Sequence, residues 1–64
     1  MENKKPVVNL IGQDGNIFNL MGIASKALKK NGMEEQARNM CSEIMASGSY
    51  DEALAILMDY VEVV

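Results

Sequence analysis

The segment from Gly12 to Gly32 (GQDGNIFNLMGIASKALKKNG) constrains the fold most, because a polar turn leads directly into one helical repeat. Asp14-Gly15 predicts a turn, since Gly adopts positive φ readily and an Asp side chain accepts from the backbone that follows it. Asn16 stands at the N-cap position, and Gly32 suits the left-handed residue that follows a helix. We therefore predict a helix of about four turns across this segment.

The predicted helix carries more apolar surface than one buried face requires. Apolar residues recur at i, i+3, i+4, i+7 and i+11, the pattern of a helix with one face in a core: Ile17, Leu20, Met21, Ala24 and Leu28. Phe18, Ile23 and Ala27 lie off that face. Its first half is therefore apolar nearly all round, which is typical of a helix covered on several sides. Two other helices, a second copy of the chain or another protein would supply that cover.

Gly22 falls in the middle of the same helix, where Gly is about 1 kcal/mol less favourable than Ala. One interpretation is that another backbone approaches closely at this position. The other is a glycine that the helix simply tolerates, and the sequence leaves both open.

Two further helices are expected. Residues 33–47 form the second, with Glu34 and Glu35 in the first turn, where the helix dipole favours acids. Ser49 opens an S-x-x-E capping box, which predicts a third helix from Tyr50 to about Tyr60. The expected buried faces are Met33, Ala37, Met40, Cys41 and Ile44 on the second helix, and Tyr50, Ala53, Leu54 and Leu57 on the third, with Val61 as a further candidate.

Two short β-branched runs, Val7–Ile11 and Tyr60–Val64, lie near the ends of the chain. A lone strand cannot satisfy its backbone groups, so we expect the two runs to pair with each other. The predicted fold is therefore α+β: a three-helix core with short N- and C-terminal strands paired in a two-stranded ribbon, the alternative being an all-α three-helix bundle. Residues 1–6 are expected to be a flexible lead-in and residues 7–64 a single small domain.

The composition argues against catalysis. A chain of 64 residues has a marginal core, and its one Cys cannot form an internal disulfide. There is no His, the commonest metal ligand and general base. Cys41 falls on an apolar face, where a thiol is expected to be inert. We predict no catalytic residue, no metal site and no cofactor, and expect support from self-association or a partner if the fold needs it.

The net charge of −3 disfavours nucleic-acid binding, which depends on a basic patch, so DNA binding ranks last among the functions considered. No apolar run approaches the ~20 residues of a membrane span, and the N-terminus lacks the apolar core of a signal peptide. A free thiol without an export signal fits a cytoplasmic protein. Another candidate ligand is a small anion or nucleotide at the turn from Gly12 to Asn16, although Asp14 would repel it.

Six methionines are many for this length, and flexible thioethers line adaptable binding surfaces as well as irregular cores. Met45 and Met58 lie beside the buried faces of their helices. Together with Phe18 and Ile23 they are the candidates for an exposed apolar patch, the mark of a protein interface. The leading hypothesis is a non-enzymatic protein-interaction domain that self-associates, for example as a homodimer, or docks another protein. The alternative is that these side chains only widen the core.

Two motifs carry a resemblance to a family. G-x-D-G-N-x-F spans Gly12 to Phe18, and S-G-x-Y-D spans Ser47 to Asp51. Together they resemble a group of very short bacterial proteins associated with phage and other mobile elements, over residues 7–64. That group usually has Asp where this chain has Ser49, and either residue can cap a helix. No activity is established for the group, so the resemblance implies bacterial origin and cytoplasmic location without a mechanism.

A second, weaker likeness is to ubiquitin-associated three-helix domains. Met21-Gly22-Ile23 is similar to their Met-Gly-Phe turn, and Gly48 stands where their third helix begins. Here the Met-Gly-Ile triplet falls inside a predicted helix.

Overall fold

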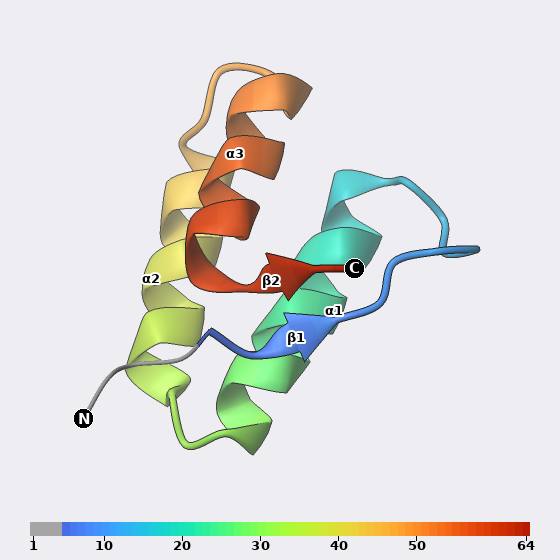
Figure 1. The fold of residues 1–64 in the computed structure, drawn as a ribbon. Coiled ribbons are helices and arrows are strands. Elements are labelled where there is room, and N and C mark those ends of the chain that lie inside the picture. The colour runs from blue at the N-terminus through green and yellow to red at the C-terminus, as the bar shows by residue number, and fades with distance from the viewer. Residues whose placement is uncertain (1–4) are drawn as a thin grey trace.

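The computed structural model describes residues 5–64, so residues 1–4 of the expected lead-in lie outside the described part of the chain. The elements follow the order β1 (Val7–Val8), α1 (Ile17–Lys30), α2 (Glu34–Met45), α3 (Tyr50–Tyr60) and β2 (Glu62–Val63) (Figure 1). The prediction of an α+β fold with paired terminal strands is confirmed, and the all-α alternative is set aside.

Local interactions of the predicted kind fix the start of α1. The Asn16 side chain accepts from the Phe18 amide at 2.8 Å, and the Asp14 carboxylate accepts from the Asn16 amide at 3.0 Å. Asn19 donates through its side chain to the Asp14 carbonyl at 2.8 Å, which closes the turn onto the helix. The positive φ of this turn lies at Gly12 (79°) and not at Gly15, so the expectation for Gly15 was wrong.

The end of α1 is a Schellman motif centred on Gly32, whose φ is 73°. The Gly32 amide donates to the Lys29 carbonyl at 3.1 Å, and the Met33 amide donates to the Leu28 carbonyl at 2.9 Å. Two otherwise unpaired carbonyls are satisfied in this way, and α2 follows after a very short turn. The predicted role of Gly32 is confirmed.

The capping box of α3 forms with one departure from the standard pattern. Ser49 Oγ accepts from the Glu52 amide at 3.2 Å, as expected. The Glu52 carboxylate reaches the amide of Gly48, at 2.8 Å, instead of that of the capping residue. The bounds of α3 match the prediction, whereas α2 ends at Met45, two residues early.

The two strands pair in parallel, with Val7 opposite Glu62 and Val8 opposite Val63 (Figure 1). Each spans two residues, which is shorter than the predicted runs. The ribbon extends into the expected lead-in, because the Glu62 amide donates to the Pro6 carbonyl at 2.8 Å and Pro6 is buried. Lys5 also contacts the rest of the chain, donating to the Met58 carbonyl at 3.1 Å.

The core lies between the three helices and the inner side of the ribbon, and among residues 5–64 it holds no buried polar side chain. Its largest fully buried side chains are Leu28, Met40, Leu57 and Val61. One predicted core residue, Tyr50, is 48% exposed. Five others are half-buried against the core: Ile17, Met21, Met33, Cys41 and Leu54. Tyr50 sits at the first position of α3, outside the space that the helices enclose.

Gly22 is exposed in the middle of α1. Within the described residues, a Cβ added there meets nothing within 4 Å, so no other backbone of the same chain approaches it. The Met21-Gly22-Ile23 triplet is helical, unlike the turn of ubiquitin-associated domains.

Candidate interaction surface

The four predicted interface residues differ in exposure. Phe18 is 60%, Met45 63% and Met58 50% exposed. Ile23 is half-buried and packs against the core, so the expectation that it adds a large exposed side chain was wrong. Its position on α1, five residues after Phe18, turns it about 140° away from Phe18 around the helix.

The three exposed residues do not form one patch. Phe18 and Met45 line a hollow of about 330 Å³ where the start of α1, the end of α2 and the start of α3 meet. Met58 lines a separate hollow of about 570 Å³ beside the ribbon, with Lys5, Val7 and Glu62 among its other lining residues. The second hollow contains charged groups of both signs, and the first is uncharged. The structure therefore brings together two of the four predicted residues.

Tyr50 shapes the first hollow and was missed by the sequence analysis. Its hydroxyl donates to the Gly15 carbonyl at 2.6 Å, tying the start of α3 to the turn before α1. Its ring contributes to the lining beside Phe18 and Met45, and Ile17, Ile44, Ser47, Gly48, Ser49 and Ala53 complete it. The motif of residues 12–18 and the motif of residues 47–51 thus meet at this hollow. The sequence held one signal of this role. A Tyr at the first position of a helix can extend its hydroxyl to a turn outside that helix.

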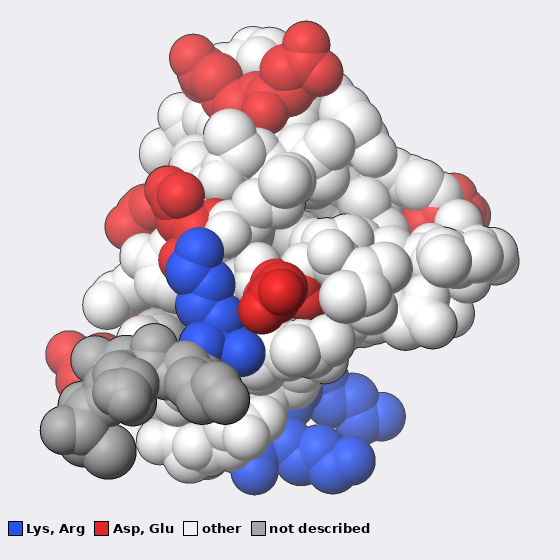
Figure 2. Space-filling view, in the orientation of Figure 1, with Lys and Arg blue, Asp and Glu red and all other residues white. Residues whose placement is uncertain are grey.

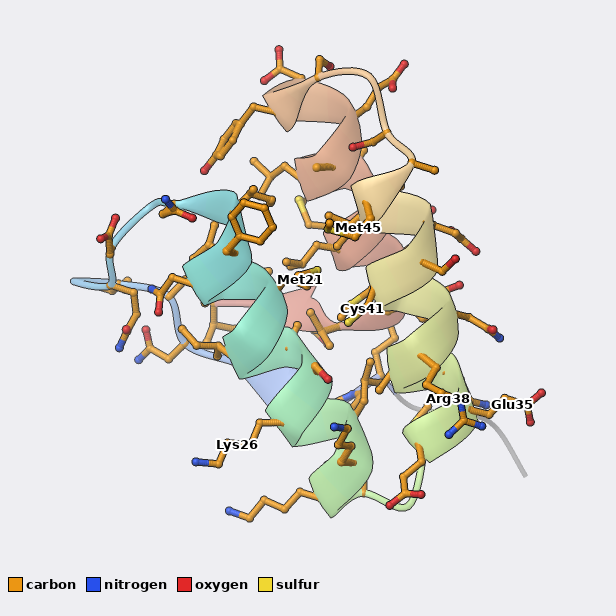
Figure 3. All side chains as sticks on the ribbon, turned by 180° about the vertical axis from the view of Figure 1, so that it is seen from behind. Met21, Lys26, Glu35, Arg38, Cys41 and Met45 are labelled. Atoms are coloured by element: carbon orange, nitrogen blue, oxygen red, sulfur yellow. The ribbon has the colours of Figure 1, made fainter. Side chains whose placement is uncertain are left out.

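Below the hollow, a strip of uncharged side chains follows the line between α1 and α2. Figure 3 shows Met21 on α1 facing Cys41 and Met45 on α2. Met21 and Cys41 are half-buried against the core, and Gly22 is exposed beside them. We call Phe18, Met21, Gly22, Cys41 and Met45 the α1–α2 face. Lys26 and Arg38 lie toward its other end (Figure 3).

Two ends of the molecule carry net charges of opposite sign, while Lys5, Glu43, Asp59 and Glu62 lie elsewhere on its surface. Asp51 and Glu52 lie in the first turn of α3, and Asp14 lies in the turn that Tyr50 contacts. Lys29 and Lys30 lie in the last turn of α1. Figure 2 shows acidic side chains over the end where α3 begins and basic ones over the end where α1 finishes. The α1–α2 face runs between these two ends.

The turn from Gly12 to Asn16 offers little to an anion. Its Asn16 and Phe18 amides are already bonded to the side chains of Asp14 and Asn16. The Asp14 carboxylate also places negative charge where an anion would sit. The anion-binding geometry at helix N-termini depends on free amides, so these contacts weigh against that alternative.

A polar contact joins α2 and α3 away from the α1–α2 face. The Tyr60 hydroxyl donates to the Glu43 carboxylate at 2.8 Å. This bond raises the pKa of Tyr60 above its usual 10.0, since it favours the neutral phenol, and burial and the charges of Glu43 and Asp59 act in the same direction. The contact stabilises helix packing and lies outside the candidate surface.

Comparison of the chain with protein-family models, curated proteins and solved structures gave no match. Among the described residues, no helix is both long and apolar enough to cross a membrane. The resemblance to the short phage- and mobile-element-associated proteins stays a prediction, and function is inferred from the surface itself.

Proposed function

We propose that this chain is a non-enzymatic protein-interaction domain that docks another polypeptide on the α1–α2 face. The observation that carries the proposal is the exposure of Phe18, Met45 and Tyr50 (60%, 63% and 48%) around one uncharged hollow. Aromatic and Met side chains are enriched at the centres of protein interfaces, where charged residues are depleted. The hollow would receive an apolar side chain of the docked polypeptide.

The energetic case is clearest for Phe18. A Phe side chain offers roughly 150–250 Å² of surface, so covering its exposed 60% removes on the order of 100 Å² from water. At about 25 cal/mol per Å² that burial is worth about 2.5 kcal/mol. Met45 adds a flexible side chain that can adjust to the shape of the bound partner. These contributions favour association with a polypeptide over exposure to solvent.

The other functions considered have less support. Anion binding competes with two occupied amides and the Asp14 carboxylate. DNA binding would require positive charge to dominate a surface, whereas Glu34 and Glu35 lie at the same end of the molecule as Lys29 and Lys30, and the net charge of the chain is −3. A cytoplasmic location remains part of the proposal on sequence grounds.

Site-specific photo-crosslinking in the protein's own cells tests the proposal. A photoreactive amino acid at position 45 is expected to give a covalent adduct with a polypeptide. The matched control places the same amino acid at exposed position 55, on α3, and is expected to give none. Absence of an adduct from position 45, or equal adducts from both positions, would overturn the proposal.

A further inference from the structure

We infer that the polypeptide docked on the α1–α2 face is a second copy of this chain, packed antiparallel about a two-fold axis that passes close to Gly22. The inference rests on the proposed function and names its partner. Three features carry it: a mid-helix glycine with open space beside it, a face of five uncharged residues, and two ends whose net charges have opposite signs.

No contact among residues 5–64 of one copy requires a glycine at position 22. It is exposed in mid-helix, where Gly is less favourable than Ala, and it is not one of the glycines with positive φ. Within the described residues nothing lies within 4 Å of a Cβ built on it. Glycine is the residue that lets a backbone approach closely. Any backbone that approaches Gly22 therefore belongs to another molecule.

The face around Gly22 can pack against itself. In a two-fold dimer the same patch meets its own copy, so charges of one sign within it would repel each other. All five residues of the α1–α2 face are uncharged, and Lys26 lies one turn after Gly22, as far from it along α1 as Phe18 is on the other side. The large side chains Phe18 and Met45 lie toward one end of the face. An antiparallel arrangement therefore sets the two large side chains of each copy against the Lys26 and Arg38 end of the other copy.

The two ends select the antiparallel direction. Lys26, Lys29 and Lys30 lie in the second half of α1, whereas Asp51 and Glu52 lie beside its start, because Tyr50 is bonded to the Gly15 carbonyl. Crossing near Gly22, close to the middle of the 14-residue α1, sets the lysine end of each copy opposite the acidic end of the other. A parallel crossing would bring like charges together. Glu34 and Glu35 also lie at the lysine end, where Arg38 and the three lysines outnumber them.

The lysine side chains also suit the hollow. Their aliphatic stems can lie along apolar surface while the ammonium groups stay in water, and a cation over an aromatic face is favourable. In a crossing at Gly22 the stem of Lys26 from the second copy would cover Phe18, and the ammonium group of Lys29 would lie toward Asp51, beside the Tyr50–Gly15 contact. The apolar side chains around the hollow are then covered without burying a charge.

The molecule has enough surface for such a dimer. A specific interface covers roughly 500–600 Å² on each partner at the small end of the stable range. That is about an eighth of the chain's 4351 Å², and the extents of 33 × 26 × 16 Å leave a broad face of sufficient size. A short chain without a disulfide is also the kind of chain that gains from oligomerisation.

The first test is the mass in solution, measured by light scattering and sedimentation equilibrium from 5 µM to 1 mM. We expect a monomer–dimer equilibrium. Gly22→Leu should raise the dimer dissociation constant at least tenfold, because the added side chain keeps the backbones apart. Ala55→Leu adds a Leu side chain at an exposed site on α3 and should leave that constant unchanged. Circular dichroism of both variants verifies that the monomer folds, as expected from the better helix propensity of Leu over Gly.

The second test exchanges charges. Lys29→Glu with Lys30→Glu in one protein, and Asp51→Lys in another, should each weaken the dimer several-fold. Mixing the two proteins should restore association as a mixed dimer, since each altered residue again faces a residue of opposite sign. Restoration identifies the antiparallel arrangement, and a mixture as weak as its components would overturn it.

A monomeric mass at 1 mM, or a dimer that Gly22→Leu leaves intact, would also overturn the inference. The crosslinking experiment separates this failure from failure of the proposed function. An adduct from position 45 with a different polypeptide, together with a monomeric mass, refutes self-association and leaves the interaction domain standing. No adduct from position 45 refutes both.

Discussion

Replacing Gly22 by Ala should stabilise the single chain. The residue lies in the interior of α1 with φ in the ordinary helical range, and a Cβ there has open space within the described residues. The added methyl group therefore meets no clash within the described residues. The expected gain is the difference in helix propensity between Gly and Ala, about 0.8–1.0 kcal/mol.

The gain converts to a large shift in melting temperature because the chain is short. Globular proteins unfold with an entropy of about 2.1 cal/mol/K per residue, which gives roughly 130 cal/mol/K for this length. A gain of about 0.9 kcal/mol then raises Tm by about 7 °C. The matched control is Ala55→Gly, the reverse change at an exposed interior position of α3, which should lower Tm by a similar amount.

Thermal unfolding followed by circular dichroism at 5 µM, where a weak dimer dissociates, measures this effect. At 500 µM the gain should shrink, since the dimer stabilises the native state by mass action and the added methyl group weakens it. If Tm at 5 µM fails to rise while the control falls as expected, a neighbour within the same chain occupies the space beside Gly22. That result would refute both the stability argument and the reason given for the glycine.

Four further outcomes are expected. Met40→Ala removes a fully buried side chain and should cost about 2–5 kcal/mol of unfolding free energy, comparable with the ~3–5 kcal/mol that a core of this size supplies. Circular dichroism at 25 °C should therefore show a largely unfolded chain, and a cooperative unfolding transition above 40 °C would contradict this. Gly32→Ala places a Cβ on a residue with φ of 73°, which costs about 1–2 kcal/mol of backbone strain. Tm should therefore fall by about 7–15 °C, and an unchanged Tm would mean that the turn rearranges freely. The pKa of Tyr60 is raised in the folded chain, so the stabilisation from its hydrogen bond is complete below about pH 10 and is lost as the pH rises through the higher folded pKa. The free energy of unfolding in urea should therefore fall less steeply between pH 9 and pH 11 for Tyr60→Phe than for the unaltered chain. Equal pH dependence of the two proteins would rule the bond out. Phe18→Ser should lower Tm at 5 µM by about 10–15 °C, because 60% of the side chain is exposed and the covered remainder, roughly 70 Å², is worth about 1.7 kcal/mol in the single chain. It should also reduce association at least tenfold, and an unchanged association would remove Phe18 from the interface.

Sequence rules located the helices because the signals that start and stop them are local. Asn16, Ser49 and Gly32 each act within four residues of their own position, through contacts that the structure shows. Pairing of the terminal strands also followed, since each had no other partner in the chain. Their parallel direction did not follow, because it depends on how three helices return the chain to its starting side.

The candidate surface was harder to predict because periodicity finds the face of a helix without counting the neighbours around it. Phe18 and Ile23 both lie off the main apolar face, yet the structure exposes the first and half-buries the second. Tyr50 keeps the spacing of Ala53 and Leu57, but at the first residue of α3 it extends past the helices that cover them. Exposure is decided by which element lies opposite, and that information is long-range.

The distribution of aromatic residues links the fold to the proposed association. The chain has one Phe, two Tyr and no Trp, and none of the three aromatic side chains is among its buried core residues. Aromatic side chains offer the largest apolar area of any residue, and a core of this size is short of such area. Tyr60 is engaged with Glu43, whereas Phe18 and Tyr50 border the same hollow. A dimer covers that hollow and adds buried apolar area to the native state, so association and folding stability rise together. Raising the protein concentration should therefore raise Tm for the unaltered chain and leave it constant for Gly22→Leu.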